Sequence, residues 1–147
     1  MPAYTIKPLV TATAINTGGR NGHSETTDHS VSVNLSVRKE MGGPGLPNTT
    51  TPEHLFAAGY AACFGGSLEY LGHQHKKSVT GTVVTCDTSI GPREGGGFGI
   101  AVKMHVKVPT LPVEEARVLV NEAHEKVCAY SNATRGNIDF VLEVEGA

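Results

Sequence analysis

Residues 57–67 read Ala57-Ala58-Gly59-Tyr60-Ala61-Ala62-Cys63-Phe64-Gly65-Gly66-Ser67 and form the centre of the longest helix that the sequence predicts. The helix is expected to begin at Pro52, because proline is favoured in a first turn, and to run to about His75. Each of the three glycines in this central stretch costs about 1 kcal/mol relative to alanine. We therefore expect another backbone or a ligand to come very close to it. Cys63 lies in the middle, either as a small buried side chain or as a reactive thiol.

On both sides of this helix, apolar residues alternate as they do in strands. A second helix is expected from Pro112 to Cys128, because apolar residues recur there at helical spacing and two glutamates lie in its first turn. The order ββ-α-ββ-α-β predicts an α+β fold, with an antiparallel sheet packed on two helices in one domain, residues 1–147. The expected strands are residues 4–16, 29–37, 78–90, 98–108 and 138–144.

Composition excludes several classes of function. The 147 residues are 39% apolar and 18% charged, which is typical of one globular domain with a core. A net charge of −2 offers no basic field for nucleic acid. No apolar run is long enough to span a membrane, and the N-terminus does not resemble a signal peptide. We therefore expect a cytoplasmic protein, in which a disulfide between any of the three cysteines would be catalytic or redox-sensing.

A reactive cysteine needs a neighbour that favours its thiolate. A free thiol has a pKa of about 8.5, so only a small fraction is ionised at pH 7. Arg20 is the candidate cation, because it lies in a glycine-flanked loop that can approach a helix closely. Its guanidinium stays charged and offers several donors in one plane. The alternative is a solvated charge at a loop tip.

Glu53 has two possible roles. Its spacing after Thr50 fits a capping box at the helix start, and its carboxylate also suits a bidentate pair with Arg20. Ten residues separate Glu53 from Cys63, about 15 Å along a regular helix, so one arginine cannot comfortably touch both. Either the helix is irregular, or a second subunit supplies Glu53. We adopt the second hypothesis, which places the active site at a homodimer interface.

Two segments resemble the Ohr (organic hydroperoxide resistance) branch of the Ohr/OsmC family. They read Thr51-Pro-Glu-His-Leu-Phe-Ala-Ala-Gly-Tyr-Ala-Ala-Cys-Phe64 and Val127-Cys-Ala-Tyr-Ser-Asn-Ala-Thr-Arg-Gly-Asn-Ile138. The Gly18-Gly19-Arg20 loop and Gly95–Ile100 are similar to the same family, so the resemblance covers nearly the whole chain in order. Cys86 is not part of the pattern.

The resemblance implies a peroxidase without a metal or cofactor that reduces organic hydroperoxides, lipid-derived ones included. By carry-over, Cys63 is the peroxidatic cysteine, Cys128 resolves its sulfenic acid, and Arg20 and Glu53 form the polar network around it. The implied fold is an intertwined homodimer, and the implied reductant is a lipoyl-type dithiol on a lipoylated protein. A Cys63–Cys128 disulfide requires Cα atoms within about 7 Å. We therefore expect the end of the second helix to abut the centre of the first.

Other interpretations stay open at this point. His73 and His75 point about 200° apart on a helix, which makes a poor metal chelate, so we read them as surface residues. A cysteine hydrolase would need a histidine base, which no spacing selects. A redox sensor would be oxidised slowly and only once per molecule. We interpret Cys86 as structural. Arg135 lies in the segment Ser131–Gly136, which we read as a turn, and it either assists the resolving cysteine or serves that turn.

Overall fold

The computed structural model describes residues 2–147, which form two compact units, one up to Pro52 and one of Glu53–Ala147. Each unit is described by itself. The expectation of a single domain stays a prediction. Within residues 2–147, no helix combines the length and the apolar character that crossing a bilayer requires.

The N-terminal unit contains a three-stranded antiparallel sheet in the order β1-β2-β3. A 3-10 turn, Gly19–Asn21, connects β1 to β2, which confirms the predicted loop around Arg20. The strands predicted at 4–16 and 29–37 are confirmed only over short stretches, and β2 was not predicted. β2 reads His-Ser-Glu-Thr, so backbone pairing on both sides, rather than an apolar face, makes it a strand. The strands are β1 Ala14–Thr17, β2 His23–Thr26 and β3 Ser32–Asn34.

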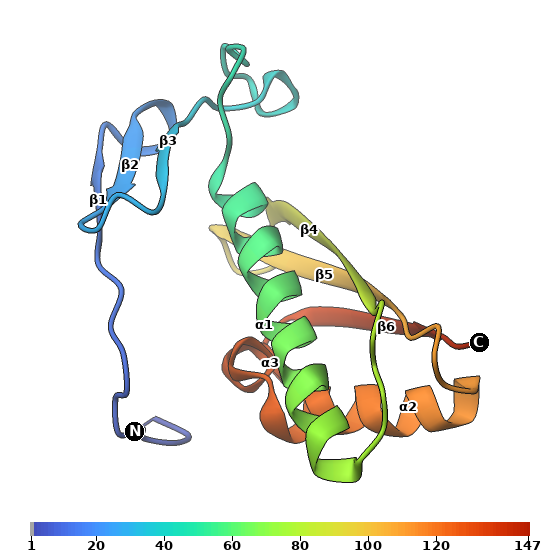
Figure 1. The fold of residues 1–147 in the computed structure, drawn as a ribbon. Helices are drawn as coiled ribbons and strands as arrows, with labels where there is room; N and C mark the ends of the chain where they lie inside the picture. Colours follow the sequence, from blue (N-terminus) through green and yellow to red (C-terminus); the bar gives the residue numbers. More distant parts are fainter. Residues whose placement is uncertain (1) are drawn as a thin grey trace. The chain divides into compact units, whose positions relative to one another are not determined.

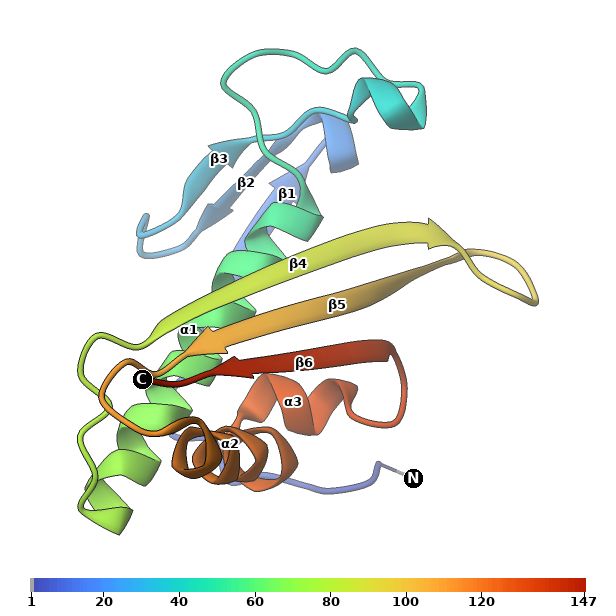
Figure 2. The ribbon, with the colours of Figure 1, turned by 90° about the vertical axis from the view of Figure 1, so that its right-hand side faces the viewer.

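The C-terminal unit is built on α1, Pro52–His75, which confirms the predicted helix. Figure 1 shows the sheet of this unit behind α1, and Figure 2 shows helices near the last strand of that sheet. The sheet order is β4-β5-β6. After α1 the elements are β4 Val83–Pro92, β5 Phe98–Lys107, α2 Val113–Glu122, a π-helical turn Ala123–Val127, α3 Ala129–Thr134 and β6 Asp139–Glu145.

Strand register defines which face of this sheet is buried. Val84 pairs with Val106 and Cys86 with Met104, so even-numbered side chains of β4 and β5 share one face. That face forms one core with residues four apart on α1 and with the apolar side of α2. The residues buried in it include Tyr60, Phe64, Leu68, Leu71, Val102, Met104, Val106, Ala116, Leu119 and Val120.

The α+β class and the packing of a sheet on helices are confirmed, with two corrections. β6 pairs parallel with β5, so this sheet is mixed rather than purely antiparallel. The α2–α3 segment is the reason, because a helical crossover returns the chain to the same end of the sheet. The second correction is α3, a third helix within residues that the sequence analysis read as a turn.

Candidate active site

Cys63 and Cys128 lie side by side in the C-terminal unit, 65 residues apart in the chain. The thiol of Cys128 donates to the Cys63 sulfur across 3.5 Å, and both cysteines are free. Cys128 is fully buried, whereas Cys63 is half-buried. A disulfide bond is about 2.05 Å long, so a small approach of the two sulfurs would join them. The expected juxtaposition of the two cysteine segments is confirmed.

A π-helical turn and a new helix start place Cys128. α2 ends at Glu122, and the next turn is wide, since the Cys128 amide donates to the carbonyl of Ala123, five residues back, at 2.8 Å. Cys128 then takes an extended conformation and precedes α3, where its carbonyl accepts from the Asn132 amide at 2.8 Å. π-helical turns are rare and often occur at functional sites.

Opposing influences act on the Cys63 thiol. Burial is the largest and raises its pKa, and the neighbouring Cys128 thiol raises it further. Backbone amides of Tyr130 and Ala129, in the first turn of α3, donate to the sulfur and lower the pKa. The net direction is upward, so a Cys63 thiolate at neutral pH requires a further positive group.

Of the three glycines within residues 57–67, Gly59 lies closest to another part of the chain. A Cβ at Gly59 would lie 3.0 Å from the hydroxyl oxygen of Tyr130. At Gly65 the nearest atom would be 3.9 Å away, on Val84, and at Gly66 nothing described lies within 4 Å. The expected close approach is therefore confirmed at Gly59, where it brings α3 against the turn of α1 before Cys63.

Buried polar side chains beside the two sulfurs were missed by the sequence analysis. The hydroxyl groups of Tyr60 and Ser131 lie 2.7 Å apart, and Ser131 Oγ lies 2.9 Å from Nδ1 of His124. Arg135 donates to the carbonyl of His124 and to the side chain of Asn132, both at 2.8 Å. Arg135 therefore has a structural role in joining the end of α3 to the π-helical turn.

Arg20 lies in the N-terminal unit, at the tip of the β1–β2 connection. Gly18 and Gly19 have φ of 85° and 63°, a left-handed conformation that favours glycine. The Asn16 side chain holds the turn, because its carbonyl oxygen accepts from the Gly19 amide at 2.8 Å. The predicted loop position of Arg20 is thus confirmed. Its pairing with Cys63 or Glu53 stays a prediction.

Glu53 lies in the first turn of α1 and borders a hollow of about 260 Å³ together with Ala57 and Cys86. α1 is continuous from Pro52 to His75, so the irregular-helix alternative is excluded and Glu53 lies about 15 Å along the helix from Cys63. Which subunit supplies Glu53 to a site stays part of the homodimer hypothesis.

Cys86 lies in β4 on the buried face of the sheet. Its sulfur is 3.8 Å from the Thr88 hydroxyl, and burial raises the pKa of its thiol. A thiol with a raised pKa in such surroundings is a poor nucleophile. These features support the structural interpretation of Cys86.

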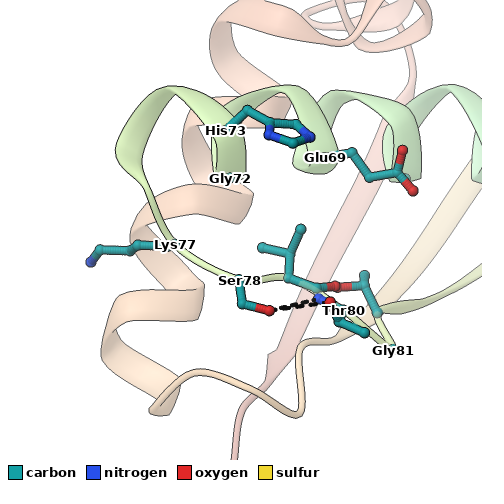
Figure 3. Close-up of a pocket in the computed structure, with 10 residues that line it drawn as sticks. Glu69, Gly72, His73, Lys77, Ser78, Thr80 and Gly81 are labelled. Carbon is teal, nitrogen blue, oxygen red and sulfur yellow. Dashed lines mark hydrogen bonds between the residues drawn. The ribbon is translucent and has the colours of Figure 1, made fainter.

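A hollow of about 550 Å³ lies along the second half of α1, where Gly65, Glu69 and His73 border it. Figure 3 shows Glu69 and His73 facing the 78–82 segment, where the Ser78 hydroxyl contacts Thr80. His75 instead pairs with Glu122, 3.0 Å away, so the two histidines do not converge. Across residues 2–147, no group of three or more histidine, cysteine or acidic side chains is arranged to bind a metal ion.

Comparison with known proteins gives consistent matches. The model of the family described as OsmC-like protein matches residues 43–143. An organic hydroperoxide resistance protein of Xanthomonas axonopodis pv. citri (strain 306) is 47% identical over 137 residues, covering 92% of this chain and 94% of that protein. The solved structure of organic hydroperoxide resistance protein OhrB of Bacillus subtilis has a TM-score of 0.85 at 40% identity, covering 94% of this chain and all of that one (100%). The solved structure of an organic hydroperoxide resistance protein of Elizabethkingia anophelis with bound thiocyanate has a TM-score of 0.90 at 42% identity. The match covers 97% of this chain and 100% of that one.

Proposed function

Because this chain belongs to the OsmC-like family, in its organic hydroperoxide resistance branch, we propose that it is a thiol-dependent peroxidase that reduces organic hydroperoxides to alcohols. The names of the relatives place the protein in redox defence against organic hydroperoxides. The proposal adds the chemistry, the residues and the reductant. One observation carries it: two free thiols 3.5 Å apart, one fully buried and one half-buried.

In the first step the Cys63 thiolate attacks the distal oxygen of the peroxide. The O–O bond breaks, the sulfur becomes a sulfenic acid, and the alkoxide leaves and takes a proton to become an alcohol. The amides of Tyr130 and Ala129 already favour the thiolate. Arg20 is proposed as the further positive group, oriented by Glu53, and it would also stabilise charge on the departing oxygen.

In the second step the Cys128 sulfur attacks the oxidised sulfur of Cys63. The S–O bond breaks, the hydroxide leaves with the proton of the Cys128 thiol as water, and a disulfide forms. Reacting atoms held about 3–3.5 Å apart are close to an attack geometry, and the two sulfurs are at that limit. The reaction is thus effectively intramolecular and competes well with further oxidation of Cys63.

In the third step a dithiol reopens the disulfide by exchange, returning two thiols and becoming a disulfide itself. We propose a lipoyl-type dithiol on a lipoylated protein as this reductant, which requires a reducing compartment such as the cytoplasm. This chain contributes only its two thiols to the cycle, so the proposal assigns it no metal or prosthetic group of its own.

An apolar substrate suits the surroundings of Cys63. Phe56 lies two helical turns before it on the same side of α1, and its ring is 5.9 Å from that of Tyr60 and 6.0 Å from that of Tyr130. Phe64, by contrast, is fully buried in the core. An aromatic border favours alkyl or lipid hydroperoxides over hydrogen peroxide, which would be desolvated there for few contacts.

A homodimer with active sites at its interface is part of the proposal. The open face of α1 carries small residues, Ala58, Ala62 and Gly66, bordered by Leu55 and Tyr70, which are 37% and 53% exposed. The N-terminal segment adds Ile6, Leu9 and Val10, which are 74%, 94% and 92% exposed. Apolar surface of this extent is typical of subunit contacts. An intertwined second copy would cover it and supply a second Arg20 and Glu53.

Stopped-flow measurement of Cys63 oxidation tests the proposed function. We expect fast, multiple-turnover consumption of a fatty-acid hydroperoxide with a dithiol, and much slower consumption of hydrogen peroxide. Cys63→Ser should abolish the reaction. Equal slow rates for both peroxides and both proteins would exclude a peroxidase, and oxidation once per molecule would indicate a sensor instead.

A further inference from the structure

A chain of buried hydrogen bonds links the two helices that carry the cysteines. Tyr60 lies one turn before Cys63 in α1, and Ser131 lies three residues after Cys128 in α3. Both residues are fully buried, and their hydroxyl oxygens are 2.7 Å apart. Ser131 in turn lies 2.9 Å from His124, in the π-helical turn between α2 and Cys128.

The third residue of this hydrogen-bond chain is His124, which lies in the π-helical turn. The His124 ring stacks on Phe140 of β6, with centroids 4.3 Å apart and planes 5° from parallel. The imidazole is thus held by the sheet on one side and by Ser131 at Nδ1. His124, Ser131 and Tyr60 therefore connect the segment before Cys128, the helix after it and the helix of Cys63.

The protonation states of Tyr60 and His124 are consistent with hydrogen bonds donated from Tyr60 toward His124. Burial raises the pKa of Tyr60, which keeps its hydroxyl protonated and able to donate. Burial also lowers the pKa of His124, which favours a neutral ring. In the tautomer with the proton on Nε2, Nδ1 accepts from Ser131 and Ser131 accepts from Tyr60, so each donor finds an acceptor. Such fully satisfied buried networks fix one arrangement of the backbone around them.

We propose that Tyr60, Ser131 and His124 are positioning residues that hold the Cys128 sulfur at attack distance from Cys63. This inference rests on the proposed function and assigns the network to its second step. The network acts on where the π-helical turn places Cys128, not on the peroxide, whereas the packing of Tyr130 against Gly59 sets the start of α3. Loss of the network therefore slows disulfide formation much more than sulfenic acid formation.

Rapid quenched-flow separates the two steps. Reduced protein is mixed with cumene hydroperoxide and quenched at successive times, and mass spectrometry follows the dimedone-trapped sulfenic acid and the disulfide. Tyr60→Phe and Ser131→Ala each remove a hydroxyl group and so interrupt the hydrogen-bond chain. Tyr60→Phe keeps the packing of the aromatic ring. Displacement of reacting groups by about 1 Å costs about 100-fold in rate. We expect disulfide formation to slow about tenfold to a hundredfold, with sulfenic acid formation within about twofold of wild type.

Ser67→Ala is the matched control. Ser67 also lies in α1 and is nearly buried, but its hydroxyl donates to the Cys63 carbonyl at 2.9 Å and is not part of the hydrogen-bond chain. Both steps should stay at wild-type rates in this variant. Unchanged disulfide formation in Tyr60→Phe and Ser131→Ala, or equal slowing of both steps, would overturn the inference while leaving the proposed function intact. Wild-type protein that forms no disulfide would overturn both.

Discussion

The Tyr130 side chain lies against the backbone of Gly59, so that a Cβ at residue 59 would lie 3.0 Å from the Tyr130 hydroxyl oxygen and 3.3 Å from its Cε2. Tyr130 also donates its backbone amide to the Cys63 sulfur. The glycine thus lets the start of α3 approach α1 closely enough for that amide to reach the thiol.

Gly59→Ala tests this relationship. Alanine favours the helix by about 1 kcal/mol, but its Cβ forces Tyr130 to shift by a few tenths of an ångström. We expect the free energy of unfolding, from urea denaturation, to change by less than about 1 kcal/mol, while Cys63 oxidation slows several-fold. Adding Tyr130→Phe removes the nearest contact and should restore part of the rate. A wild-type rate in Gly59→Ala would contradict the assigned role of the Tyr130 amide.

Arg20→Ala tests the source of positive charge. Burial raises the pKa of Cys63, and loss of the proposed guanidinium should raise it further, leaving less thiolate at pH 7. Each unit of pKa above the pH reduces the thiolate about tenfold. The rate of Cys63 oxidation against pH should therefore shift to higher pH, with Arg20→Lys in between. An unchanged profile in Arg20→Ala would exclude Arg20 from the site.

Cys128→Ser separates the two cysteine roles. With no resolving thiol, Cys63 should be oxidised once at close to the wild-type rate and then remain a sulfenic acid, 16 Da heavier in intact-mass measurement, about one oxygen atom. Turnover with a dithiol should fall strongly or require direct reduction of the sulfenic acid. Cys86→Ser is the control and should turn over normally, because its sulfur contacts Thr88 rather than the paired cysteines. Full turnover by Cys128→Ser would favour a mechanism without it.

Burial lowers the pKa of His124, with the charge of Arg135 as a smaller cause. The unfolded chain therefore binds a proton at this histidine more readily than the folded one. The folded state should lose stability as pH falls below about 6.5, until the folded pKa is passed. NMR titration of the His124 ring should give a pKa below that of an ordinary histidine, and His124→Asn should weaken the pH dependence of unfolding. A normal or raised pKa would contradict the buried neutral ring.

Local sequence pattern predicted the elements that depend on local pattern. α1 begins at Pro52 and ends at His75 as expected, because both its start signal and its length can be predicted from its own residues. β2 was missed since its four residues show no apolar alternation. The parallel pairing of β6 depends on where α2 and α3 return the chain, which alternation does not encode.

The candidate site was predictable in part for the same reason. The family resemblance singled out Cys63 and Cys128, and the structure brings their sulfurs together. The amides that donate to Cys63 belong to the backbone of α3, so no side-chain motif predicts them. Ser131 looked like a turn residue, and its role beside His124 appears only with the π-helical turn.

Mapping the disulfide formed by one equivalent of hydroperoxide tests the central claim most directly. Reduced protein is treated with cumene hydroperoxide, alkylated, digested without reductant and analysed by mass spectrometry. The proposed mechanism predicts a peptide pair joined through Cys63 and Cys128, with Cys86 alkylated. A Cys63–Cys86 link, or Cys63 oxidised to a sulfinic acid with Cys128 still alkylated as a free thiol, would contradict it.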